Sequence, residues 1–112
     1  MAFDETLAER IRLALADAPD LHERLMFGGI AFMVTGHMAC GVVREALMLR
    51  LGPEGAAAAL AQPHVRPMDF TGRPMRSMVL VSPEGVRTDT DLERWVSRAT
   101  RFVATLPPKR LG

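Results

Sequence analysis

The chain has 112 residues, of which 48% are hydrophobic and 24% charged, and its formal net charge is +1. This length and composition are typical of one globular domain, residues 1–112, with a single hydrophobic core, and they exclude a mainly disordered chain. No stretch approaches the ~18 uncharged apolar residues that a membrane-spanning helix requires, so we expect no membrane association.

Residues 4–18 predict an amphipathic helix. Asp4 stands where a side chain can cap the first turn, and Pro19 ends the pattern. Leu13 lies on the face opposite the apolar stripe. The stripe has helical spacing and consists of Leu7, Ala8, Ile11, Ala14, Leu15 and Ala18.

Three short apolar runs follow and predict three strands of an antiparallel meander. Thr35-Gly36 and Arg44-Glu45 predict tight turns between them. In the first run both sets of alternating residues are apolar, so neither face of the sheet is expected to face water. We therefore expect a cover on the second face, and another copy of the chain, in a homodimer, is one candidate. The runs are RLMFGGIAFMV (24–34), HMACGVV (37–43) and ALMLRL (46–51).

The second half of the chain predicts a helix, two strands and a final helix. The final helix carries an apolar stripe that includes Trp95, and Thr90 with Glu93 predicts its capping box. The expected fold is α+β, an antiparallel sheet of about five strands with helices packed on it, in the order α-β-β-β-α-β-β-α. The elements are expected at 53–61 (helix), 68–70 and 76–81 (strands) and 91–106 (helix).

Cys40 is the only cysteine, which excludes an intrachain disulfide and favours a reducing compartment such as the cytoplasm. His37 and Cys40 are three residues apart on a predicted strand and should point to opposite faces, so we expect no metal site. No base or helix N-terminus is evident beside Cys40, which indicates a core residue. The chain contains no phosphate-binding loop, nucleophile elbow or HExxH motif, so we expect neither an enzyme nor a cofactor.

Arg50 lies inside the apolar run LMLRLG and must be either solvated or paired. Asp69 is a candidate partner, for which Arg73 would compete. Arg50 and Arg73 would bind an anion if both converge on one pocket. The sequence therefore keeps open a small-molecule or anion sensor, or a weak enzyme, as the alternative function.

Four other residues are candidates for partner binding. Gly28-Gly29 predicts a bulge or a close backbone approach in the middle of a strand. Met68 and Met75 lie in a proline-rich loop and are expected to be the most exposed methionines, and flexible methionines suit adaptable partner surfaces.

Basic residues do not form the clustered face of a nucleic-acid-binding protein. Residues 1–56 carry 5 basic and 8 acidic side chains, and residues 57–112 carry 9 and 5. Such a modest dipole predicts no direct binding to DNA. Arg94, Arg98 and Arg101 share one side of the last helix, where either a solvated face or contact with phosphates or an acidic partner would explain them.

The order of these motifs resembles the N-terminal domain family of the TfoX/Sxy competence regulators, over about residues 3–109. The resemblance implies a secretion-chaperone-like α+β fold and a regulatory role. Full-length members promote transcription of competence genes together with a cyclic-AMP-responsive activator. The motifs are ERLMFGGIAFMVTGHMACGV, LMLRLGPE, RPMDFTGRPMRSMVLV and a Trp-bearing last helix that ends in LPPK.

Full-length members of that family carry a second, C-terminal domain of helical-hairpin type, whereas this sequence ends at Gly112, directly after LPPK. It therefore resembles the stand-alone N-terminal form. The family supplies no catalytic residues to transfer. The leading hypothesis is a non-catalytic regulatory module that binds a protein partner, such as a transcription factor.

Overall fold

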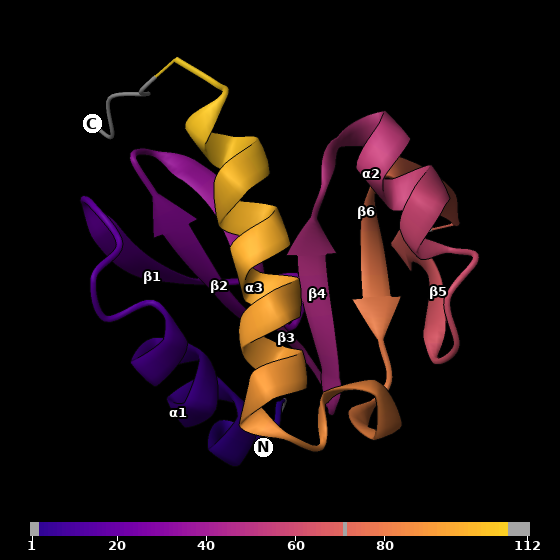
Figure 1. Ribbon diagram of the computed structural model, residues 1–112, viewed down its shortest axis with the longest axis horizontal. Helices are drawn as coiled ribbons and strands as arrows, with labels where there is room; N and C mark the ends of the chain where they lie inside the picture. The colour runs from indigo at the N-terminus through magenta and orange to yellow at the C-terminus, as the bar shows by residue number, and fades with distance from the viewer. Residues whose placement is uncertain (1–2, 71, 108–112) are drawn as a thin grey trace.

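Six strands form one antiparallel sheet in the order β1-β2-β3-β4-β6-β5, and helices cover one of its faces (Figure 1). The computed structural model describes residues 3–70 and 72–107. In this part of the chain the α+β prediction is confirmed, with one more strand than expected. The elements are α1 (Glu5–Ala14), β1 (Leu21–Met26), β2 (Gly29–Val34), β3 (His37–Val43), β4 (Ala46–Arg50), α2 (Gly52–Ala59), β5 (Val65–Phe70), β6 (Arg73–Val81), the short 3-10 helix η1 (Pro83–Val86) and α3 (Asp89–Ala104).

The extra strand arises because a tight turn divides the expected first strand. Phe27 and Gly28 both have positive φ, 57° and 73°, and Met26 pairs with Gly29. This is the geometry of a two-residue hairpin of type I′. A mid-strand bulge at Gly28 was therefore the wrong prediction. The close approach is real at Gly29, where a Cβ atom would collide with the carbonyl oxygen of Val42 on β3. The predicted turns at residues 35–36 and 44–45 are confirmed.

The first residues of α1 and α3 are each preceded by a side chain that caps the helix. Asp4 caps α1 as predicted, its Oδ1 accepting from the backbone N–H of Leu7 at 3.1 Å, although the helix ends at Ala14. In α3 the predicted capping box is displaced. Thr88 Oγ1, and not the hydroxyl of Thr90, accepts from the backbone N–H of Asp91 at 3.1 Å. A threonine stands at each position, and only the one in extended conformation before the first turn can cap it.

One ion-pair cluster joins α1 to the edge strand β1. Arg12 donates to both carboxylate oxygens of Glu23, at 2.7 and 2.9 Å, and to Glu9 at 2.6 Å. The guanidinium holds the pKa of the Glu23 carboxyl below its ordinary value. The same guanidinium lies 5.9 Å from the ring centroid of Phe32. The cluster therefore covers the edge of the hydrophobic core beneath α1.

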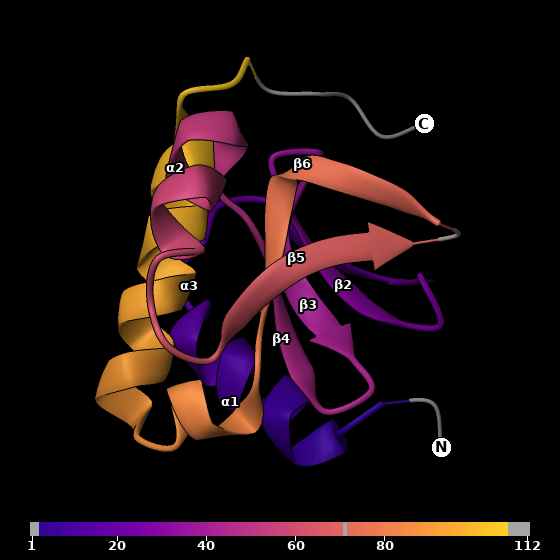
Figure 2. The ribbon, with the colours of Figure 1, turned by 90° about the vertical axis from the view of Figure 1, so that its right-hand side faces the viewer.

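The helix-covered face of the sheet carries the larger hydrophobic core. Strand residues Phe32, Leu47 and Leu49 pack there against Ile11 of α1 and Trp95 of α3. Figure 2 shows α1, α2 and α3 together on this side of the sheet. Cys40 belongs to this core and is fully buried, which confirms the prediction of a core cysteine.

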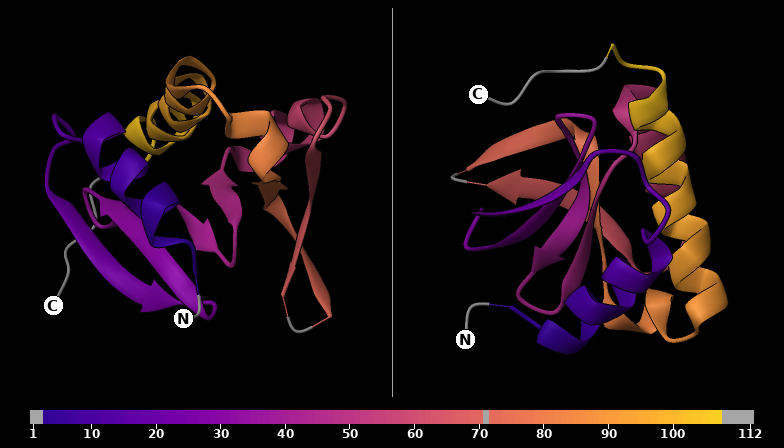
Figure 3. Two further views of the ribbon diagram at one scale, coloured as in Figure 1. Left: turned by 90° about the horizontal axis from the view of Figure 1, so that it is seen from below. Right: turned by 90° about the vertical axis from the view of Figure 1, so that its left-hand side faces the viewer.

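The opposite face is also apolar, and the chain covers it by itself. Figure 3 shows that the sheet curls, so that the β5–β6 hairpin faces β1, β2 and β3 across a concave surface. A second core fills that concavity, and each of its buried members is at most 8% exposed. The expected cover on the second face is therefore the curled sheet itself, which removes the reason for expecting a second copy there. These members are Ala31, Met33, Met38, Ala46, Met48, Met68, Met78 and Leu80.

Met68 and Met75 are not the exposed pair that was predicted. Met68 is only 2% exposed, and Met75 is partly buried against the same second core. The proline-rich segment is strand β5, paired with β6, so Met68 points into the concavity. Prolines in an edge strand are compatible with such pairing, because one side of the strand needs no donor.

If the second core stabilises a single chain, Met48→Ala should lower its free energy of unfolding by about 2–5 kcal/mol, since it empties a fully buried site. Leu25→Ala, at a side chain 79% exposed, should change it by less than about 0.5 kcal/mol. Chemical denaturation measures both. A denaturation midpoint that rises with protein concentration would show that the folded chain associates and would contradict stability from a single chain.

Burial also predicts the reactivity of Cys40. Desolvation raises the pKa of its thiol to about 12, and only the thiolate attacks a disulfide reagent. Near about pH 8 the folded protein should therefore react with a disulfide reagent on the order of a thousandfold more slowly than the protein unfolded in guanidinium. The chain is its own control because it has one cysteine. Rapid labelling of the folded protein would contradict the burial.

Candidate functional site

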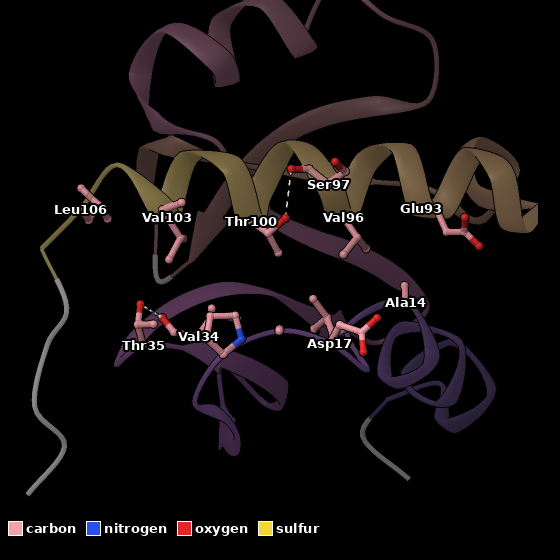
Figure 4. A pocket seen from close by; sticks show the side chains of 14 residues that line it. Ala14, Asp17, Val34, Thr35, Glu93, Val96, Ser97, Thr100, Val103 and Leu106 are labelled. Carbon is pink, nitrogen blue, oxygen red and sulfur yellow. Dashed lines mark hydrogen bonds between the residues drawn. The ribbon is translucent and has the colours of Figure 1, made fainter.

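A cavity of about 520 Å³ lies between α3 and the segment that leads from α1 to β1 (Figure 4). We call it the α1–α3 groove. It forms because α1 ends at Ala14, whereas α3 continues alongside it to Ala104. The lining residues are Ala14 at the end of α1, Leu15, Asp17, Ala18 and Pro19 after it, Val34 and Thr35 at the end of β2, and Glu93, Val96, Ser97, Thr100, Val103, Ala104 and Leu106 on and after α3.

The floor of the groove is aliphatic. Val34, Val96 and Val103 are buried at its base, each at most 5% exposed. Alanine and serine side chains on the walls are too short to fill the space between α3 and the α1–β1 segment. A cavity of this size and apolar character falls in the range of binding sites for small ligands or single large side chains.

Two kinds of polar group border this floor. The hydroxyls are satisfied locally, because Thr100 donates to the Ser97 carbonyl at 3.1 Å and Thr35 to the Val34 carbonyl at 2.7 Å. The carboxylates of Asp17 and Glu93 are exposed and form no ion pair with any residue that the structure describes. Figure 4 shows these two side chains on opposite walls. The groove can therefore receive an apolar group that carries a neighbouring cation.

Arg50 does not pair with Asp69, its candidate partner from the sequence, in the part of the chain that the structure describes. Its guanidinium lies 5.9 Å from the ring centroid of Phe102 on α3, and no described ion pair joins it to Asp69. Along the sheet Arg50 pairs with Met78 on β6, whereas Asp69 pairs with Pro74 near the tip of the β5–β6 hairpin. Its charge is instead placed over an aromatic ring at the end of its strand.

Arg73 begins β6 at the tip of the β5–β6 hairpin, opposite Phe70. Arg73 and Met78, the partner of Arg50, both lie on β6. At ~3.3 Å per residue, their positions along the strand are about 16 Å apart. The side chain of Arg73 lies outside the part of the chain that the structure describes. Convergence of Arg50 and Arg73 on one anion therefore stays a prediction.

The other residues singled out from the sequence lie elsewhere. Gly28 borders a wide hollow of about 920 Å³ beside Arg44 and Arg66, and Gly29 is buried in β2. Met68 and Met75 belong to the second core. None of these four lines the α1–α3 groove. Sequence reasoning missed the groove because its walls come from three segments that are far apart in the sequence and form a cavity only when they pack together.

The part of the chain that the structure describes comprises residues 3–70 and 72–107. It holds no group of three or more His, Cys, Asp or Glu side chains arranged to bind a metal ion. Ring nitrogen Nε2 of His37 lies 2.6 Å from the carbonyl oxygen of Pro107, so this histidine serves to hold the chain after α3 against β3. No helix there is long and apolar enough to cross a membrane.

Comparison with known proteins places the chain in a family. A search of the curated proteins found no match. The family model described as the TfoX N-terminal domain matches residues 13–103, which is most of the chain and includes every lining residue of the α1–α3 groove except Ala104 and Leu106. The resemblance seen in the sequence motifs is thereby confirmed. The chain belongs to the TfoX N-terminal domain family.

Proposed function

We propose that this chain is a non-catalytic regulatory module that binds a protein partner through the α1–α3 groove. The observation that supports this most directly is the combination of an open aliphatic floor with two unpaired carboxylates, Asp17 and Glu93. A partner segment with one large apolar side chain and a neighbouring basic residue would fit both features. Aliphatic grooves of this kind receive amphipathic helices in other recognition modules.

The chemistry of the groove supports binding over bond making. Among the described residues, its lining offers two carboxylates and three hydroxyls but no cysteine, lysine or histidine, and nucleophilic catalysis needs a nucleophile activated by a neighbouring base. Cys40 lies in the core, where it cannot meet a substrate. We therefore propose that the protein is not an enzyme.

The carboxylates of Asp17 and Glu93 at the groove would repel the phosphates of DNA. They therefore also support a protein partner over direct contact with DNA. The family resemblance implies a cyclic-AMP-responsive transcription activator as that partner. On this proposal the module works in the cytoplasm, where a lone cysteine stays reduced.

A bulky residue in the groove should block the partner. Ala104 is exposed at the end of α3 and lines the groove, so Ala104→Trp should fill it without removing a core contact. Titration calorimetry with the purified cyclic-AMP-responsive activator of the same cell should show binding to the unaltered chain and at least about tenfold weaker binding to this variant.

Ala57→Trp is the matched control, since Ala57 is also exposed but lies on α2, away from the groove. It should bind within about twofold of the unaltered chain. Equal binding by both variants would move the docking site elsewhere on the surface. Absence of any binding, or a salt-dependent gel shift of DNA by the chain alone, would contradict action through this partner.

A further inference from the structure

The side of α3 that faces α2 has a different character from the α1–α3 groove. The described ion pairs use Arg10, Arg12 and His22 as their cations. Arg94, Arg98 and Arg101 have helical spacing along α3 and form no ion pair with any carboxylate in the described ranges. Unneutralised guanidinium groups on one helix face are the donors that carboxylates and phosphates select.

Arg98 is held in place by an aromatic ring. Its guanidinium carbon lies 4.8 Å from the ring centroid of Trp95, and the indole is 8% exposed beneath it. Stacking restrains the guanidinium plane, while its N–H groups donate to no residue that the structure describes. A restrained arginine loses less conformational entropy when it binds an anion than a freely rotating one.

Two cavities open beside Arg98, one between α3 and α2 and the other between α3, η1 and the segment that follows α2. The larger, of about 290 Å³, has Arg98 and Arg101 on one wall and Gln62 on the other. The remaining lining residues, Leu51, Gly55 and Ala58, carry no polar side chain. We call this cavity the α2–α3 hollow, and it is lined by Leu51, Gly55, Ala58, Gln62, Arg98 and Arg101.

We propose that the α2–α3 hollow binds a small organic carboxylate. The carboxylate lies between the guanidinium groups of Arg98 and Arg101, and the apolar body of the ligand lies against Leu51 and Ala58. The hydrogen bond that Arg101 makes to Ser97 Oγ is long, at 3.4 Å, and leaves its other donors available.

The neighbouring charges favour a small ligand over an extended polyanion. Glu84 and Asp91 border the adjoining cavity of about 240 Å³ together with Arg94 and Arg98, so the acidic and basic charges there balance. A nucleic acid or a strongly acidic peptide that crossed both cavities would meet these carboxylates as well as the arginines and would gain little from the balanced charges. A single carboxylate between two arginines avoids them. This site is separate from the groove that faces α1, so it does not depend on the proposed protein partner.

Trp95 is the only tryptophan in the chain, and it lies beneath the guanidinium of Arg98, so its fluorescence reports on a ligand that binds this guanidinium. Its fluorescence should change saturably when sodium benzoate is added, because benzoate combines one carboxylate with a short apolar body. Benzyl alcohol, which lacks the charge, and inorganic phosphate, which lacks the apolar body, should each bind at least about tenfold more weakly. Equal binding of phosphate, or no saturable change with benzoate, would overturn the proposal.

Variants locate the binding. Arg101→Gln and Arg98→Gln should each weaken benzoate binding by about tenfold or more. Arg24→Gln, at an exposed arginine of β1, removes the same charge and should leave it within about twofold. Because Arg98→Gln also uncovers Trp95, side-chain Nε–H resonances give a second readout. Benzoate should shift those of Arg98 and Arg101 but not that of Arg24. Unchanged affinity in Arg101→Gln together with unshifted Arg98 and Arg101 resonances would refute the site.

Discussion

Removal of both faces of a single sheet from water is the constraint on which the rest of this structure depends. The helices α1, α2 and α3 cover one face, and no helix covers the other in residues 3–70 and 72–107. The sheet therefore curls on itself, and its concave face closes over a second core rich in methionine. Unbranched methionine side chains suit such a space, because they adopt whatever rotamers an irregular concavity requires. Met48, from the middle of β4, is fully buried there.

The same constraint places both candidate sites in the helix layer. α3 runs its full length over the middle of the sheet and forms a wall of each site (Figure 1). Towards α1 it presents Glu93, Val96 and Thr100, and towards α2 it presents Arg98 and Arg101. Helical spacing separates these two sets by only a few residues in sequence but by a wide angle around the axis. One helix thus offers an aliphatic surface bordered by acids on one side and a basic surface on the other.

The motifs that mark the family lie mainly where the fold has its strictest steric demands. The MFGG motif forms the β1–β2 turn, where Gly29 also lies too close to β3 for any side chain. The PMDF motif forms β5 and places Met68 in the second core. Neither of these two motifs lines a candidate site, whereas Val34, Thr35 and Leu106 of the other family segments line the α1–α3 groove and Leu51 lines the α2–α3 hollow. Membership of the TfoX N-terminal domain family therefore accounts for the architecture, whereas function must be argued from the surface residues.

The sequence by itself determined the local features: the amphipathic helices, the Asp4 cap, the turns at residues 35–36 and 44–45, and apolar residues on both sheet faces. Each depends on periodicity or on hydrogen bonds within a few residues, and these operate before distant segments meet. Only the tertiary structure decided that Phe27-Gly28 is a turn, that Met68 is buried, and that small residues from α1, β2 and α3 leave a groove. These depend on how far the sheet curls and where α1 stops beside α3, which are set by packing between segments far apart in the chain.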